Sequence, residues 1–210
     1  MVVTVAALFV LPDGPYANLP DVDPWPESRD ARLYTGPWPV VAHPPCARWG
    51  FFWWGGPTAK VRRKMGDDDG CFAAALKAVR TWGGVLEHPA NSRAWVAFGL
   101  PRPDRRGGWH RTLCGGWTTH VEQGQYGHDA RKATWLYVNG VQPEDLPRLK
   151  WGRGPQPKRW CSNLDLRNGR RPSRTGVKQL MSKRQRSLTP IPFRDLLLAL
   201  ARSVRQPVAT

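Results

Sequence analysis

The sequence lacks an apolar run long enough to span a membrane, and it lacks the paired cysteines of zinc ribbons and disulfide frameworks. A membrane-spanning helix needs about 20 consecutive apolar residues. The apolar residues 1–11 lack the positive n-region and cleavage site of a signal peptide. The four cysteines are far apart and form no CxxC pair: Cys46, Cys71, Cys114 and Cys161. We therefore expect a cytoplasmic protein with reduced thiols, no membrane contact and no evident protein partner.

Acidic residues are also scarce. The 210 residues include 16 Asp and Glu against 32 Lys and Arg, which gives a formal net charge of +16. Such an excess of positive charge indicates a polyanionic partner, most simply DNA, because phosphate contacts release counterions. Ribosomal or membrane-surface binding would produce the same composition. The length suits one core with appendages better than two full domains.

Short apolar segments and one amphipathic segment indicate the fold class. Residues 2–10 and 40–42 are apolar and rich in valine and alanine, as buried parallel strands are. Residues 71–82 have apolar positions at helical spacing, and glycines follow at 83 and 84. Residues 85–88 form another strand. This order predicts a βαβ unit, and we expect an α/β fold with a Rossmann-like, mostly parallel sheet of reduced size and flanking helices.

Composition divides the chain into three parts. Residues 1–140 form the expected core, which includes further strands at 117–123 and 134–138. Residues 141–187 carry thirteen Lys or Arg against three acids and show no sustained hydrophobic period. Residues 188–210 contain a helix expected over 193–204, with leucines at 196, 197 and 200 that pack back on the core.

The basic segment 141–187 is either a solvated tail or a nucleic-acid-binding region. Twelve tryptophans are many for this length, and two of them are interleaved with basic residues in this segment. Aromatic rings beside cations favour nucleic-acid binding, because bases stack on the rings and the cations contact phosphates. The candidate binding residues are Trp151, Arg153, Lys158, Arg159, Trp160, Arg170 and Arg171.

A cysteine follows the second strand directly, in the segment Ala-His-Pro-Pro-Cys. The prolines Pro44 and Pro45 end the strand and stiffen its loop. Ligands of open α/β sheets bind at the carboxyl ends of the strands, so Cys46 is a candidate thiolate nucleophile, which requires a partly exposed, electropositive setting. The alternative is a packing residue, which free cysteines usually are. Glu87 ends the next parallel strand and should lie at the same edge of the sheet.

The order of these motifs resembles that of DNA cytosine-5 methyltransferases, and in particular small phage-encoded methylase-like proteins with an Ala-His-Pro-Pro-Cys segment. The resemblance rests on Pro45-Cys46, on Glu87 in Glu-His-Pro and on Tyr126-Gly127 followed by Arg131-Lys132. It also includes Thr-Pro-Ile-Pro at 189–192, before the last helix.

The resemblance implies a role for each of these residues. Cys46 would attack C6 of a flipped pyrimidine, Glu87 would bind its N3 edge, and Arg131 or Lys132 would lie near the flipped nucleotide. The cofactor would be S-adenosylmethionine, and the terminal proline-rich helix would complete its site. The family's glycine-rich cofactor loop is reduced here, and the candidate cofactor-binding residues are Phe9, Gly14, Asp23 and Asp30.

Two other interpretations remain open at this point. The protein could be a catalytically silent nucleic-acid-binding protein of phage on the same scaffold, a difference that cofactor binding would test. A zinc-binding basic protein would use His110, Cys114, His120 and Cys161, although the 110/114/120 spacing fits no common zinc pattern. We favour the methyltransferase-like interpretation and expect no metal.

Overall fold

A computed structural model describes residues 4–56, 59–159 and 181–205. The strands of the described sheet are β1 (Val5–Leu8), β2 (Val22–Trp25), β3 (Val40–Ala42), β4 (Gly84–Pro89), β5 (His110–Arg111), β6 (Trp117–Glu122) and β7 (Ala133–Asn139). The α-helices are α1 (Cys71–Trp82), α2 (Arg93–Ala97), α5 (Lys183–Ser187) and α6 (Ile191–Arg202). Short 3-10 helices cover Glu27–Arg29, Ala31–Leu33, Gln123–Tyr126 and Pro143–Asp145.

The sheet is mixed, with the strand order β2-β1-β3-β4-β7-β6-β5. The pairs β1–β2, β1–β3 and β3–β4 are parallel, whereas β4–β7, β6–β7 and β5–β6 are antiparallel. The α/β class is thus confirmed, but the expectation of a mostly parallel sheet was wrong for its second half. The physical reason is the short connection between β6 and β7, which reverses the chain without a crossover helix.

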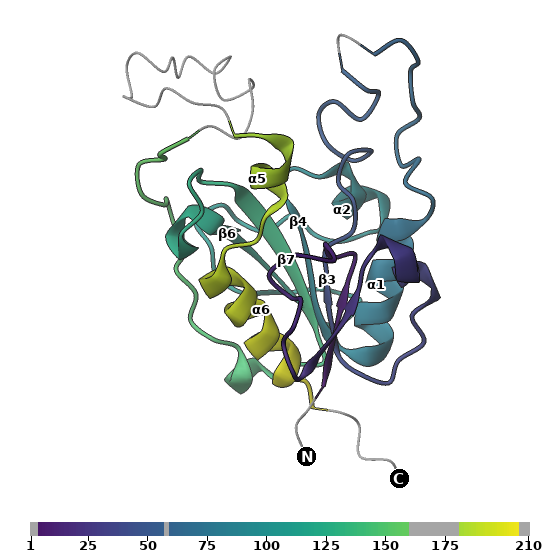
Figure 1. Ribbon diagram of the computed structural model, residues 1–210. Coiled ribbons are helices and arrows are strands. Elements are labelled where there is room, and N and C mark those ends of the chain that lie inside the picture. Colours follow the sequence, from purple (N-terminus) through teal and green to yellow (C-terminus); the bar gives the residue numbers. More distant parts are fainter. Residues whose placement is uncertain (1–3, 57–58, 160–180, 206–210) are drawn as a thin grey trace.

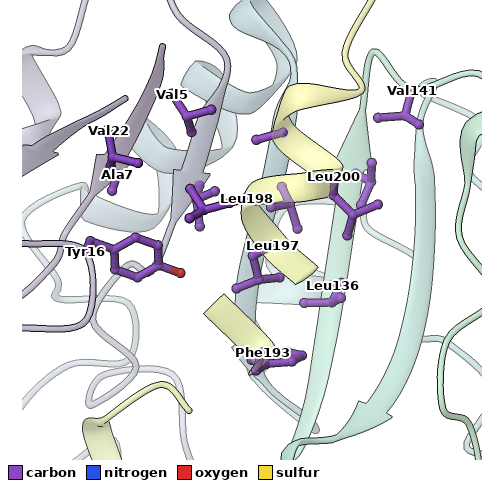
Figure 2. Packing of buried hydrophobic residues seen from close by; sticks show 14 of the residues in the cluster. Val5, Ala7, Tyr16, Val22, Leu136, Val141, Phe193, Leu197, Leu198 and Leu200 are labelled. Atoms are coloured by element: carbon purple, nitrogen blue, oxygen red, sulfur yellow. The ribbon is translucent and has the colours of Figure 1, made fainter. Parts of the chain in front are cut away.

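Helix α6 covers one face of the sheet, and helices α1 and α2 lie on the other (Figure 1). On one face, leucines of α6 pack against valines and alanines of β1, β3 and β4, and Figure 2 shows Leu197, Leu198 and Leu200 between this helix and the strands. On the other face, Phe72 and Leu76 of α1 pack against the alternate residues of the same strands. The terminal helix packs on the core, and α6 begins at Ile191 rather than at residue 193.

Helix α1 has the bounds that its periodicity predicts, and a single carboxylate fixes its beginning. Asp68 Oδ2 accepts hydrogen bonds from the Phe72 N–H at 3.0 Å and from the indole Nε1 of Trp49 at 2.7 Å. These two contacts tie the loop after β3 to the start of α1. Lys77 and Arg80 are exposed on the outer face, as expected.

The chain beyond residue 140 remains attached to the core up to residue 159. Val141 and Leu149 are buried in the cluster under α6, and the Lys150 N–H donates to the Tyr126 hydroxyl at 3.1 Å. The described first part of the basic segment is therefore packed on the sheet. No helix in residues 4–56, 59–159 or 181–205 is long and apolar enough to cross a membrane.

Candidate functional site

The strand order reverses between β1 and β3. The chain passes from β1 to β2 on one side and returns to β3 on the other, so the loops after β1 and β3 diverge from neighbouring carboxyl ends. Open α/β sheets bind ligands at such a point. The loop after β1 contributes Tyr16, and the loop after β3 contributes His43 and Cys46. These two loops define the site.

The register of β3 and β4 brings His43 next to Glu87. Val41 pairs with Val85 in the parallel ladder, and both residues face α6. Side chains two residues apart on a strand point to the same face, so His43 and Glu87 lie on the same face as Val41 and Val85. Their contact is direct, with 3.0 Å between His43 Nδ1 and Glu87 Oε2. Glu87 thus lies toward α6, whereas the next residue, His88, is buried against Phe72 on the α1 face.

Glu87 is the centre of a buried hydrogen-bond network. Its Oε1 accepts from Gln123 Nε2 at 3.0 Å, and the Tyr16 hydroxyl lies 2.9 Å from His43 Nε2. An ionised carboxylate only accepts, so we assign the hydrogen of the His43–Glu87 contact to Nδ1. In a neutral imidazole, Nε2 then accepts from the Tyr16 hydroxyl. The network holds Glu87 in one orientation at the carboxyl edge of the sheet.

The protein environment keeps Glu87 ionised. Its exposed fraction is only 7%, and burial by itself would raise its pKa. The hydrogen bond from His43 and the positive charge of Lys132 outweigh burial and hold the pKa of Glu87 at about 2. At neutral pH the site therefore contains a buried carboxylate that accepts hydrogen bonds and has little capacity to donate a proton.

Cys46 lies in an exposed turn directly after the two prolines. The surrounding protein atoms, which displace part of the water, raise the pKa of its thiol, and the negative charge of Glu87 raises it further. Lys132 and Arg186 act in the opposite direction but do not compensate. The electropositive setting expected for a thiolate is thus only partly present. In the free protein Cys46 is a thiol, and a reaction at its sulfur must also remove the proton.

The two basic candidates after β6 have different surroundings. The charge of Lys132 acts on both Glu87 and Cys46, and its ammonium lies 3.5 Å from the Leu188 carbonyl oxygen. Arg131 instead lies against Glu122, with 3.7 Å between its Nε and the carboxylate. Cys46 therefore follows β3 and Glu87 lies near the end of the neighbouring parallel strand β4. The charge of Lys132 lowers the pKa of both groups, and Arg131 lies against Glu122.

We expect Glu87→Gln to shift the alkylation of Cys46 toward lower pH. Glu87 raises the pKa of Cys46, so loss of its charge increases the thiolate fraction at a given pH. The measurement is the rate of iodoacetamide modification of each cysteine between about pH 6 and about pH 10, read by peptide mass spectrometry. Cys114, which is also exposed, is the internal control and should keep its profile. An unchanged Cys46 profile would mean that the two groups do not interact.

A pocket of about 510 Å³ lies beside this network. Gly14 lines it from the loop after β1, His128 from the turn before β7, and residues 188–191 from the start of α6. Cys46 and Glu87 do not line it. The pocket contains one candidate cofactor-binding residue, Gly14, together with the Thr-Pro-Ile segment.

The other cofactor candidates lie elsewhere. Phe9 has a left-handed backbone, with φ of 59°, and packs against the core under α1. Asp23 in β2 accepts from the Trp25 indole at 2.8 Å and pairs with Arg29. Asp30 caps the 3-10 helix Ala31–Leu33 and pairs with Arg32 at 2.7 Å. None of these three residues lines the pocket that contains Gly14.

The candidate nucleic-acid-binding residues divide into three groups. Trp151 is half-buried against the core, and its indole donates to Thr119 Oγ1 at 3.0 Å, so much of its ring is used in packing. Arg153 and Lys158 are exposed, while Arg159 lies 3.7 Å from the Asp129 carboxylate. Trp160, Arg170 and Arg171 lie outside the described residues.

The zinc interpretation finds no support in the described part of the chain. His120 is buried and accepts from the Trp135 indole at 3.2 Å, whereas His110 and Cys114 are exposed. Among residues 4–56, 59–159 and 181–205, no three His, Cys, Asp or Glu side chains form a group able to hold a metal ion. Cys161 lies outside the described residues.

Three residues of the network were not predicted from the sequence: Tyr16, His43 and Gln123. A signal for His43 existed, because it follows Val41 by two residues as Glu87 follows Val85. Tyr16 and Gln123 reach the network through the loop after β1 and through the 3-10 turn Gln123–Tyr126, and no local pattern marks either.

No family model matches this chain, and no curated protein matches its sequence. Any assignment of function therefore depends on the geometry and chemistry of the site.

Proposed function

We propose that this protein acts on a pyrimidine base of DNA, with Cys46 as the nucleophile and Glu87 as the base-binding carboxylate. One observation carries the proposal: Cys46 follows β3 and Glu87 lies near the end of β4, the parallel strand paired with β3, so both residues lie at the same carboxyl edge of the sheet. The strand order β2-β1-β3-β4 supports a Rossmann-like scaffold with its ligand crevice at that edge. In motif order the chain resembles DNA cytosine-5 methyltransferases, which use the same two residue types.

The chemistry suits these residues. C5 of cytosine is a weak nucleophile until a sulfur adds to C6, which places electron density on C5 and N3. When the Cys46 sulfur forms this bond, the thiol proton leaves to solvent or to a neighbouring base. The ionised Glu87 oxygens retain lone pairs beyond the bonds from His43 and Gln123, and they accept from the exocyclic amine of cytosine. Lys132 balances the negative charge that develops near Cys46 and Glu87.

The pocket beside the network fits a cofactor of the size of S-adenosylmethionine. Its volume lies within the usual range of ligand pockets. Its wall includes His128, whose Nδ1 lies 2.9 Å from the Ala130 carbonyl oxygen and 3.0 Å from the Ala130 nitrogen. The buried Nε2 of His128 has no partner within the described residues, and a hydroxyl of a ligand, which can donate or accept, would satisfy it. Gly14, His128 and Thr189 would hold the cofactor, which supplies an electrophilic methyl group when bound.

A second candidate function is that of a catalytically silent nucleic-acid-binding protein of phage on this scaffold. The observations that favour it are the raised pKa of Cys46 and the ion pairs that occupy Asp23 and Asp30. Under this alternative the site retains its shape but transfers no methyl group, and nucleic-acid affinity comes from the exposed cations.

Methyl transfer to an oligonucleotide distinguishes these two functions. We expect the full chain with S-adenosylmethionine to produce 5-methylcytosine, detected by mass spectrometry after nuclease digestion, and Cys46→Ser to reduce the rate about 100-fold or more. Thr189→Trp, which places a large ring at the pocket wall, should reduce methyl-donor binding and leave DNA binding unchanged. Retained DNA binding without any methyl transfer by the unmutated protein would overturn the enzymatic proposal and support the silent alternative.

A further inference from the structure

The loop after Cys46 carries aromatic and basic residues, most of which lie outside the core. We call residues 47–56 and 59–66 the aromatic–basic loop. It holds aromatic residues at positions 49 and 51–54 and cations at positions 48, 60 and 62–64, and its described residues include no Asp or Glu. Figure 1 shows it extending beyond the carboxyl edge of the sheet, the edge that α5 also borders. Its position next to Cys46 places it at the entrance to the site.

The base of the loop is fixed to the core. Trp49 is buried, with its ring against Phe72 at a centroid distance of 6.0 Å and against Phe98 at 5.8 Å. Its indole donates to Asp68, and the Gly66 N–H donates to the Arg48 carbonyl oxygen at 3.1 Å. The loop therefore starts and ends at an anchored position. Its solvent-exposed side chains are held near the site.

The outer part of the loop presents one exposed ring, three half-buried rings at positions 52–54 and exposed cations at positions 60 and 62–64. Phe51 is 59% exposed, and its ring meets Phe52 edge-on at 5.0 Å. The Arg62 guanidinium lies over the Trp54 ring at 5.7 Å, and the Arg63 N–H donates to the Trp54 carbonyl oxygen at 3.2 Å. Large apolar surface of this kind usually marks a binding site.

The chemistry of this surface favours unpaired bases over other ligands. Exposed rings stack on the faces of bases, and adjacent cations contact the phosphates between them. In a duplex the base faces are covered by neighbouring pairs, so rings on a loop have access to them only where the strand is single. Positive charge also continues from the loop to the site, because Lys132 and Arg186 both act on Cys46. A phosphodiester strand that crosses the loop toward Cys46 meets cations along its path.

We propose that the aromatic–basic loop binds unpaired bases of single-stranded nucleic acid and delivers the neighbouring base to Cys46 and Glu87. Binding of single strands by the loop does not depend on the proposed function. Delivery of a base to Cys46 and Glu87 does rest on the proposed function. Single strands are then the preferred substrate, and no base has to be flipped out of a duplex. Phe51 and Trp54 are the stacking residues, and Arg62 holds Trp54 and contacts phosphate.

The test is equilibrium binding of fluorescein-labelled oligonucleotides to the full chain. We expect the single strand to bind about tenfold more tightly than a hairpin duplex of the same sequence at equal salt. The double variant Phe51→Ala/Trp54→Ala should lose about tenfold in single-strand affinity and leave duplex affinity nearly unchanged. Arg62→Gln should weaken single-strand binding and reduce its salt dependence. Circular dichroism confirms that each variant is folded.

A matched control is available at the opposite edge of the sheet. Trp38 precedes β3 and is 37% exposed. Its backbone carbonyl oxygen, rather than its ring, accepts from the Tyr34 hydroxyl at 2.7 Å, so Trp38→Ala removes an exposed ring without touching the loop. This variant should bind single strands as the unmutated protein does. Equal affinity of the loop variants and the unmutated protein would overturn the proposal. So would loop-dependent binding to phosphatidylserine vesicles without a preference for single strands, which would indicate a membrane surface.

Failure of the enzymatic proposal gives a different result. If Cys46 is not a nucleophile, Cys46→Ser has no effect on activity, but loop-dependent binding of single strands persists. If the loop proposal fails, the loop variants bind normally whatever the activity of Cys46. The two measurements together therefore separate binding by the loop from chemistry at the site.

Discussion

A single-stranded oligonucleotide that contains 5-fluorocytosine should form a covalent adduct with Cys46 in the presence of S-adenosylmethionine. Sulfur addition to C6 is normally reversed when the proton at C5 is removed and the sulfur leaves. Fluorine at C5 cannot be lost as a cation, so the bond between Cys46 and the base persists. The adduct should survive a denaturing gel, and its mass should equal that of the protein plus the methylated oligonucleotide.

Cysteine variants identify the residue that forms the adduct. Cys46→Ser should abolish it. Cys114→Ser is the matched control, because Cys114 is also exposed and the hydrogen bonds from Thr112 and Arg80, with the charge of Arg80, outweigh burial and lower the pKa of its thiol. A nonspecific reaction would therefore favour Cys114. An adduct that disappears in Cys114→Ser and remains in Cys46→Ser would rule out Cys46 as the nucleophile, and no adduct in any variant would support the silent alternative.

Local patterns predicted the elements that surround the site because each has a clear period. The apolar strand before Pro44, the amphipathic helix over 71–82 and the strand that ends near Glu87 all appear in the structure. β2 was missed because Pro24 and Asp23 read as loop residues, although an edge strand tolerates proline. The position of β7 between β4 and β6 could not be predicted, because periodicity identifies a strand but not its neighbours.

The site was predictable only in part for the same reason. Cys46 and Glu87 follow from strand ends in one βαβ unit, which requires no knowledge of the rest of the sheet. Lys132 was one of two basic candidates, and only the turn between β6 and β7 decides that it faces Glu87 while Arg131 faces Glu122. Gln123 depends on the same turn, since it lies at the end of β6 and bonds across to Glu87. Contacts between distant loops are set by tertiary packing, which sequence patterns do not encode.

Replacement of Glu87 should reduce stability more than any other change in the site. Glu87→Ala removes the acceptor of His43 Nδ1 and of one of the two Gln123 Nε2 hydrogens, although Gln123 Nε2 still donates to Thr134 Oγ1. An unsatisfied buried donor costs about 1–3 kcal/mol, so we expect the free energy of unfolding to fall by about 3 kcal/mol at neutral pH. Urea denaturation followed by tryptophan fluorescence measures the change. Glu144→Ala, in which an exposed carboxylate loses its contact with Arg205, is the matched control and should change stability by less than about 1 kcal/mol.

The contribution of Glu87 should also disappear in acid. Its pKa is about 2 in the folded protein against an ordinary value of 4.5, so the unfolded chain takes up a proton at a higher pH than the folded protein does. Stability from Glu87 is therefore fully present above about pH 5 and is lost as the pH falls toward about 2. Since one pKa unit corresponds to about 1.4 kcal/mol, the loss amounts to about 3 kcal/mol. Between about pH 5 and about pH 3, the free energy of unfolding should fall less steeply in Glu87→Gln than in the unmutated protein, because all other carboxylates are common to both. Equal slopes would show that Glu87 is not held ionised by His43 and Lys132, and the site would then lack the carboxylate on which its proposed chemistry depends.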